Sequence, residues 1–213
     1  MQAPAWPHAG VRRHMTTYTR LRYDVAKFPL ADLVREVMDV DDLEGLAASE
    51  WLATRETDQS TPYHKRFYDN VDVISPAYRT LVRHLLGDTA DDVYLQRIPT
   101  FRVHLRNSVA VGSWHRDRDF GHDSAEVNYW VPLTRAFGNN TLWIDKEPVH
   151  AEYGEVIVFD GANSWHGNVV NDTEISRVSI DFRTLPRAAY RPNDRKSVSY
   201  GLPFLLGEYW DTV

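Results

Sequence analysis

The feature that most constrains the fold of this chain is a series of short apolar runs in its second half. About eight segments rich in Val, Ile, Tyr, Trp and Phe are separated by Gly, Asn, Asp and Pro, which is typical of β-strands. The predicted strands are residues 93–98, 100–105, 113–117, 126–133, 140–144, 155–159, 165–170 and 175–184. Because these runs are too short for core helices, we expect a mainly β structure.

The first half of the chain carries helical periodicity instead. Apolar residues recur at helical spacing over residues 30–38, and residues 41–52 predict a second helix. Residues 54–63 are polar and predict a loop. Ser75 followed by a proline predicts the start of a third helix, which ends at Gly87.

This order of elements predicts one domain of α+β character, with helices packed on a jelly-roll-like double sheet. We expect a flexible tail at residues 1–16 and a single domain over 17–213, with a helical part at 29–87 and a β core at 93–184. Residues 18–28 predict an edge strand, and the aromatic segment 200–210 is expected to dock back on the sheet.

Composition excludes several classes of protein. The net charge of -6 disfavours a nucleic-acid partner, and the absence of Cys excludes disulfides and thiolate metal sites. The chain shows neither a signal peptide nor an apolar run long enough to span a membrane. We therefore expect a cytoplasmic protein without membrane partners, in which His and carboxylates hold any transition metal.

A candidate metal motif begins at His115-x-Asp117, whose side chains share one face of a strand. With 9 His in the chain, about one such motif is expected by chance. The context adds weight, because His166 follows a strand and a Gly turn. Two imidazoles and one carboxylate can bind one face of a ferrous ion and leave positions open for chemistry. A rival pair, His150-x-Glu152, lies in a polar turn.

An anion site is predicted on the last strand, where Arg177, Ser179, Asp181 and Arg183 share one face. A guanidinium beside a hydroxyl suits a carboxylate, so Arg177 with Ser179 is a candidate for binding a dicarboxylic co-substrate. The alternative is a structural ion pair of Asp181 with Arg177 or Arg183. A weaker match, Arg106-x-Ser108, precedes the metal motif.

Several polar and aromatic residues are candidates for ligand contacts because of their positions on the predicted strands and loops. Asn128 is expected to contact the co-substrate or the substrate. The candidate substrate contacts are Trp130, Thr141, Trp143, His104, Asp119 and His122. For the tryptophans the competing interpretation is an ordinary core position.

Over residues 93–184 the chain resembles the Fe(II)/2-oxoglutarate-dependent oxygenase superfamily. The resemblance rests on His115, Asp117, His166, Arg177 and Ser179, in that order and at suitable spacings. It implies a double-stranded β-helix, a jelly roll of cupin type. It also implies Fe(II) on the first three residues, 2-oxoglutarate on the last two, and O2 as co-substrate.

More narrowly, residues 115–122, 126–133 and 140–144 resemble oxygenases from streptomycin-type aminoglycoside biosynthesis clusters. That likeness implies an oxidoreductase of antibiotic biosynthesis, which hydroxylates or otherwise oxidises a C–H bond of a small, polar, sugar-like substrate. The carboxylate of Asp117 disfavours halogenation, since halogenases of the superfamily need that coordination position for chloride.

Two other functions stay open. One is a cupin-type metal-dependent sugar isomerase, epimerase or dioxygenase that uses no 2-oxoglutarate, and the Arg177-x-Ser179 pair disfavours it. The other is a non-enzymatic carbohydrate-binding jelly roll, which the three candidate ligands disfavour. The sequence does not identify the substrate, the carbon attacked, the choice among hydroxylation, desaturation, cyclisation and epimerisation, the oligomeric state, or whether residues 1–14 are native.

Overall fold

In the residues that the structure describes, the fold consists of two antiparallel sheets and three α-helices. The computed structural model describes residues 18–47, 61–108, 114–198 and 201–213. The large sheet has the strand order β1 (Tyr18–Arg22), β7 (Glu155–Phe159), β4 (Val127–Pro132), β9 (Arg177–Pro186), β2 (Val93–Gln96) and β10 (Trp210–Thr212), with β3 (Thr100–His104) also paired to β9. The small sheet has the order β6 (Glu147–Val149), β5 (Leu142–Ile144) and β8 (His166–Gly167).

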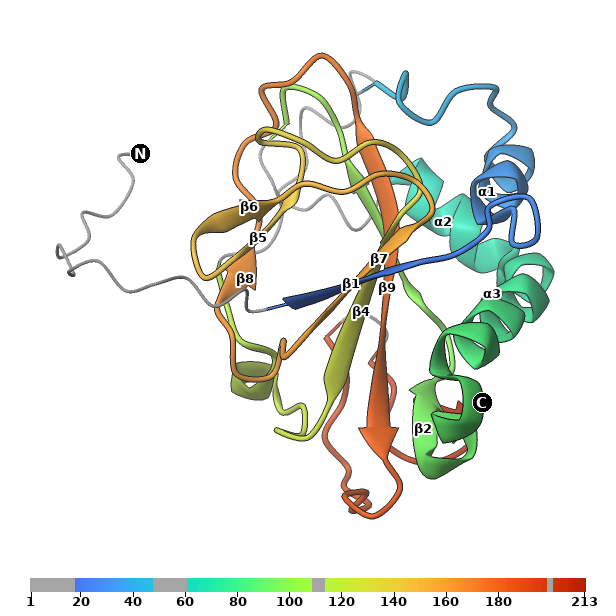
Figure 1. Ribbon diagram of the computed structural model, residues 1–213, viewed down its shortest axis with the longest axis vertical. Coiled ribbons are helices and arrows are strands. Elements are labelled where there is room, and N and C mark those ends of the chain that lie inside the picture. The colour runs from blue at the N-terminus through green and yellow to red at the C-terminus, as the bar shows by residue number, and fades with distance from the viewer. Residues whose placement is uncertain (1–17, 48–60, 109–113, 199–200) are drawn as a thin grey trace, which may run out of the picture.

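The helices cover one face of the large sheet and the small sheet lies over the other (Figure 1). They are α1 (Leu30–Met38), α2 (Pro62–Asp69) and α3 (Val71–Leu86). Their buried side chains join those of the large sheet in one apolar cluster. A second cluster fills the space between the two sheets and includes Trp130, Ile157 and Phe159 from the large sheet. This arrangement confirms the predicted jelly roll with helices packed on one sheet.

Strand β9 positions the candidate site because its two faces have different chemistry. Val178, Ile180 and Phe182 enter the cluster shared with the helices. Arg177 and Arg183 belong to the alternate residues, and both are buried on the face directed away from the helices. The predicted alternation along this strand is therefore confirmed, and the polar row lies inside the molecule.

Three predictions for the helical part are wrong. Residues 54–63 are not all loop, because Thr61 is the N-cap of α2 and Pro62 is its first residue. Helix α3 begins at Val71 and runs through Pro76, so Ser75 is no N-cap. Residues 41–47 form turns rather than a helix, and the rest of that predicted helix lies outside the described residues.

The strand predictions hold for most runs, with differences at short elements. The predicted strand at 113–117 is wrong, because His115 makes one isolated bridge and Asp117 begins the 3-10 helix η4 (Asp117–Phe120). Strands β6 and β10 were not predicted as strands. The edge position of β1 is confirmed, and so is the docking of the C-terminal segment, since β10 pairs with β2.

The predicted flexible tail at residues 1–16 lies outside the described residues. No helix in the described ranges combines the length and the apolar composition that a membrane span needs.

Candidate metal centre

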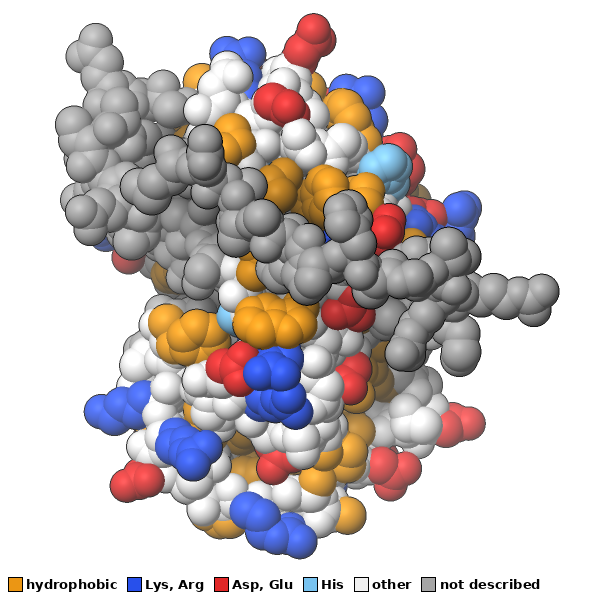
Figure 2. All heavy atoms as spheres, turned by 90° about the vertical axis from the view of Figure 1, so that its left-hand side faces the viewer, with side chains coloured by type: hydrophobic (Ala, Val, Ile, Leu, Met, Phe, Trp, Pro, Cys, Tyr) orange, Lys and Arg blue, Asp and Glu red, His pale blue; other side chains and the backbone are white. Residues whose placement is uncertain are grey.

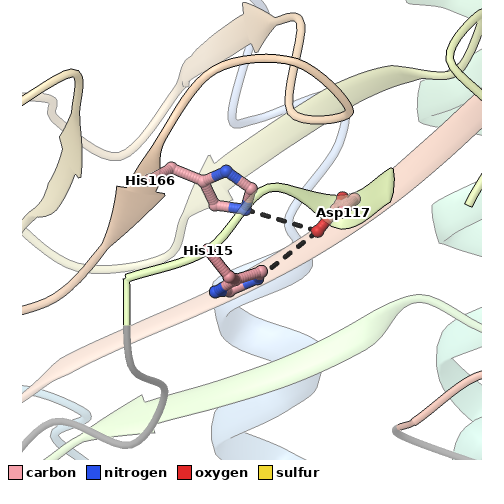
Figure 3. A group of neighbouring side chains, drawn as sticks. All are labelled: His115, Asp117 and His166. Carbon is pink, nitrogen blue, oxygen red and sulfur yellow. Dashed lines mark ion pairs between the residues drawn. The ribbon is translucent and has the colours of Figure 1, made fainter. Parts of the chain in front are cut away.

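Two imidazoles and one carboxylate converge between the sheets. The Nε2 atoms of His115 and His166 each lie 3.4 Å from Oδ1 of Asp117. Figure 3 shows both rings directed at this carboxylate from separate segments of the chain. Within the described part of the chain, these residues form a group whose ligand atoms all lie within 4.8 Å of one another. The structure thus brings together the three residues that the sequence predicts as metal ligands.

Backbone hydrogen bonds hold the three residues in place. His115 and His166 exchange a pair of bonds, N to O, of 3.0 and 2.9 Å. The extended backbone of Arg116, with φ −117° and ψ 140°, turns Asp117 back to the side of His115. The amide of Asp117 then donates to Gly161 O at 2.9 Å. A short bridge and a 3-10 turn therefore achieve the convergence that a regular strand was predicted to give.

The ring of His166 is oriented by a carbonyl. Its Nδ1 lies 3.0 Å from Ser164 O. Because a carbonyl oxygen only accepts hydrogen bonds, Nδ1 carries a proton, and in the neutral ring Nε2 then presents a lone pair. This lone pair faces the carboxylate of Asp117, as in metal-ligating histidines whose other nitrogen is fixed by a carbonyl.

The carboxylate of Asp117 is buried and charged. Burial raises the pKa of this carboxyl group, but the Arg183 guanidinium holds it well below its ordinary value. Its Oδ2 accepts from Asn128 Nδ2 at 2.7 Å and from Arg183 Nε at 2.8 Å. The group is therefore a permanent anion near neutral pH.

The donor set fits a first-row divalent metal. Facial ligands bonded at roughly 2.1 Å lie about 3 Å from one another. The two Nε2 to Oδ1 separations of 3.4 Å are slightly wider, so a small movement of the side chains would close them around an ion. The imidazole and carboxylate donors are also those that non-haem ferrous sites use.

Arg177 and Ser179 are brought together as predicted. Both are buried, and Arg177 donates from Nη1 to Ser179 Oγ at 2.7 Å and from Nε to Asn140 O at 3.0 Å. Its guanidinium carbon lies 5.7 Å from the ring centre of Trp130. Trp130 itself is buried between the sheets, in accordance with the alternative of a core position.

Asp181, the alternative partner of Arg177, has other neighbours. Its carboxylate accepts from Arg102 Nε at 2.8 Å and lies 3.6 Å from Arg183 Nη1. The structural pair of Asp181 with Arg183 is therefore present, while the guanidinium of Arg177 is directed to Ser179.

Two predicted substrate contacts have buried nitrogen atoms without a hydrogen-bond partner among the described residues. These atoms are both ring nitrogens of His104 and Nε1 of Trp143. His104 is the antiparallel neighbour of Arg177, so the two side chains share a face. Burial, with a smaller contribution from Arg177, lowers the pKa of His104 to about 3. The ring beside Arg177 is therefore neutral near pH 7.

Two other predicted contacts use their polar atoms inside the fold. The hydroxyl of Thr141 donates to Val149 O. His122 is a candidate substrate contact in the sequence, but its Nδ1 lies 2.7 Å from Glu126 Oε2 and its ring centre lies 4.7 Å from that of Phe204. Asn128, expected to bind a ligand, instead donates to Asp117, although its Oδ1 has no partner in the described part of the chain.

Two exposed aromatic residues lie next to the candidate ligands. His115 is 25% exposed through its side chain, and the edge-on ring of Phe120 lies 5.2 Å from it. Phe120 and Trp165 are 45% and 46% exposed, and Arg116 lies over the Trp165 ring. Asp119 pairs with Arg116. Figure 2 shows hydrophobic, basic and acidic side chains gathered beside a histidine on this face.

The rival motifs lie apart from the three ligands. His150 and Glu152 are exposed, and Arg20 donates to the carbonyl of His150. Arg106 is exposed at a turn in which Ser108 Oγ donates to Leu105 O at 2.6 Å.

Sequence reasoning missed the contribution of Arg183. The alternation along β9 predicts that Arg183 faces inward, but it does not identify the partner, because Asp117 lies 66 positions away in the sequence. The available signal was a second inward arginine on a strand that already carried one, since a buried cation needs an anion nearby.

Comparisons with known proteins found similarity in sequence to a curated protein and similarity in fold to solved structures. The chain is 85% identical over 199 residues, covering 93% of it and 100% of the relative, to the streptomycin biosynthesis protein StrG of Streptomyces griseus. A solved structure of EctD from S. alaskensis with bound Fe matches with a TM-score of 0.51 and 16% identity, over 81% of this chain and 74% of that chain. CytC3 with Fe(II) and alpha-ketoglutarate matches with a TM-score of 0.50 and 12% identity, over 80% and 73%. At such identities the structural likeness shows the fold, that of the cupin-type non-haem oxygenases. No protein-family model matches the chain.

Proposed function

The chain belongs to the family of the streptomycin biosynthesis protein StrG, and from this premise we propose that it is an Fe(II)- and 2-oxoglutarate-dependent oxygenase. Its proposed substrate is a small, hydroxylated, sugar-like intermediate of a pathway of the streptomycin type. The observation that carries the proposal is the convergence of His115 and His166 on one oxygen of Asp117.

This convergence favours a cation. With Nδ1 of His166 protonated, its neutral ring directs a lone pair at a carboxylate oxygen that also carries lone pairs. Two such acceptors repel each other unless a proton or a metal ion lies between them. The imidazole of His115 is directed at the same oxygen. One proton can lie between only two of these three atoms, whereas a metal ion can bind all three, so the arrangement favours the metal.

The co-substrate is proposed to bind through Arg177 and Ser179. When bound, ferrous iron and a 2-oxo acid supply an oxidant for C–H bonds, by placing one atom of O2 in the succinate formed on decarboxylation and the other in the substrate. The guanidinium and the hydroxyl are 2.7 Å apart and buried, so they can grip the distal carboxylate of the diacid. His104, neutral and on the same face, can donate a further hydrogen bond.

The other residues orient the substrate and exclude water. Phe120 and Trp165 present exposed rings beside His115 and can stack on the apolar face of a sugar ring. Asp119 and Trp143 stay proposed as polar contacts for its hydroxyl or amino groups.

An anaerobic titration tests the proposal. Adding Fe(II) and 2-oxoglutarate to the apo protein should give the weak visible charge-transfer band of a chelated 2-oxo acid. His115→Ala should abolish the band, because one of three ligands is lost, whereas the matched control His150→Ala should retain it. Succinate formation across a panel of aminocyclitols and sugars would then identify the substrate.

The role of Arg177 separates this proposal from its alternatives. Arg177→Leu should weaken 2-oxoglutarate binding at least tenfold in calorimetry while iron still binds, since each lost charge-assisted pair costs about 1.5–3 kcal/mol. Iron binding by the wild type without any 2-oxoglutarate binding would point to a cupin-type enzyme of another class. Binding of neither would leave a carbohydrate-binding jelly roll.

A further inference from the structure

The two oxygens of the Asp117 carboxylate have different surroundings. Oδ1 faces the imidazoles of His115 and His166 at 3.4 Å. Oδ2 accepts hydrogen bonds from Asn128 Nδ2 at 2.7 Å and Arg183 Nε at 2.8 Å, and it also lies 2.7 Å from Arg183 Nη2 in the same ion pair. One oxygen is thus left for a metal while the other is fully occupied by the protein.

Arg183 is itself held firmly. Its side chain is 8% exposed, and its third nitrogen, Nη1, lies 3.3 Å from Gln96 Oε1 and 3.4 Å from the hydroxyl of Tyr209. Glu126 Oε2 lies 3.9 Å from Nε. Nη1 is therefore held by Gln96 of β2 and by Tyr209 of the C-terminal segment, while Nε and Nη2 face Asp117.

The Asn128 amide is placed just as tightly. A methyl group added at Gly161 would lie 2.4 Å from Asn128 Nδ2, a distance that real atoms do not tolerate. Gly161 also accepts the backbone amide of Asp117. A glycine is needed here so that the amide can reach the carboxylate.

We propose that Arg183 is a positioning residue which, with Asn128, restricts Asp117 to one metal-binding oxygen. This inference rests on the proposed function, because it requires a metal at the site. A carboxylate whose second oxygen already accepts two hydrogen bonds and contacts a second guanidinium nitrogen would not also bind an ion with that oxygen. When a metal is bound, this would leave a coordination position for the 2-oxo acid and O2. Arg183 and Arg177 lie on the same face of β9, which therefore orients both a metal ligand and the co-substrate.

Cobalt(II) binding to the full chain tests the inference without turnover. Arg183→Met keeps much of the side-chain volume and removes the fork, so Co(II) should bind 10- to 100-fold more weakly, as is typical when a supporting partner of a ligand is lost. The visible Co(II) spectrum should also change, because Asp117 becomes free to bind through both oxygens. A purely structural role would lower the melting temperature of the apo protein and leave the spectrum unchanged.

Two further variants complete the experiment. Arg183→Lys keeps the charge and one donor nitrogen in place of the guanidinium fork. Its Co(II) affinity should therefore fall between those of the wild type and Arg183→Met. If Arg183→Met does not fold, the Co(II) affinity and spectrum of Arg183→Lys alone test the positioning role. The matched control is Arg20→Met, which removes a guanidinium from the buried Glu155 away from the site and should leave the Co(II) affinity unchanged.

The results distinguish this inference from the function on which it rests. Wild-type affinity and spectrum in the Arg183 variants, while the wild type binds Co(II), would overturn the positioning role alone. Failure of the wild type to bind Co(II) or Fe(II) at all would overturn both.

Discussion

His64 is a buried histidine whose protonation couples the stability of the fold to pH. It is 2% exposed, and its Nδ1 lies 2.7 Å from Thr61 Oγ1. Burial, with a contribution from Arg102, lowers its pKa from 6.5 to about 4. The unfolded chain takes up this proton near pH 6.5 and the folded chain only near pH 4. The stability that the neutral ring contributes is therefore complete above pH 6.5 and is lost as the pH falls toward 4.

We expect this residue to account for a loss on the order of 3 kcal/mol in the free energy of unfolding between pH 7 and pH 4. Gln does not titrate, so in His64→Gln the free energy of unfolding should fall by about 3 kcal/mol less than in the wild type between pH 7 and pH 4. Urea titrations at a series of pH values measure this difference. In the control His150→Gln, at an exposed position, the free energy of unfolding should change with pH as it does in the wild type. An equal slope for His64→Gln and the wild type would contradict the assignment.

Thr61 begins helix α2, an element that presents its buried face to the large sheet. Its hydroxyl accepts from the backbone amide of His64 at 3.3 Å, and the ring of Phe67 on the same helix stacks 4.3 Å from that of Phe101 on β3. Removal of an N-cap hydroxyl costs about 0.5–2 kcal/mol. Thr61→Ala should therefore lower the free energy of unfolding by about 1 kcal/mol, and Thr61→Ser should restore most of it.

The control for this cap is Thr80, an exposed hydroxyl in the middle of α3 that donates to Pro76 O. Thr80→Ala should change stability by less than about 0.5 kcal/mol, as surface substitutions usually do. Similar losses at both threonines would argue against a capping role for Thr61.

The same two helices show what the sequence could and could not predict. Thr61-Pro62 and Ser75-Pro76 both have a hydroxyl residue before proline, yet only the first pair starts a helix. In α3 the buried Ile74 precedes Pro76, so apolar packing extends the helix past the proline. Local sequence signals therefore predict that a helix is present, whereas the burial of apolar side chains in the folded protein determines where the helix begins.

At the site the same division holds. Alternation along the chain predicted that Arg177 and Ser179 share an inward face, because strand periodicity is local. The 3-10 turn at Asp117 was not predictable, since it depends on the bond from its amide to Gly161, 44 positions later. The pairing of Arg183 with Asp117 likewise depends on strand order, which a single sequence does not reveal.

At the scale of the whole molecule, the candidate metal centre joins the two sheets. His166 belongs to β8 of the small sheet, and Asp117 is held by Asn128 and Arg183 from β4 and β9 of the large sheet. His115 is tied to His166 by their backbone bridge. An ion bound here would link segments that the fold otherwise connects through the apolar layer between the sheets.

Metal binding should therefore stabilise the entire fold. A ligand that binds only the native state at 100 times its dissociation constant adds about 2.7 kcal/mol. For a chain of this size each kcal/mol raises the melting temperature by about 2–4 °C, so Ni(II) or Co(II) added to the metal-free protein should raise it by roughly 5–10 °C. His166→Ala should lose this increase and His150→Ala should keep it. Because ions can also bind weakly to exposed His and carboxylates, an equal increase in His166→Ala and the wild type would place the stabilising ion elsewhere.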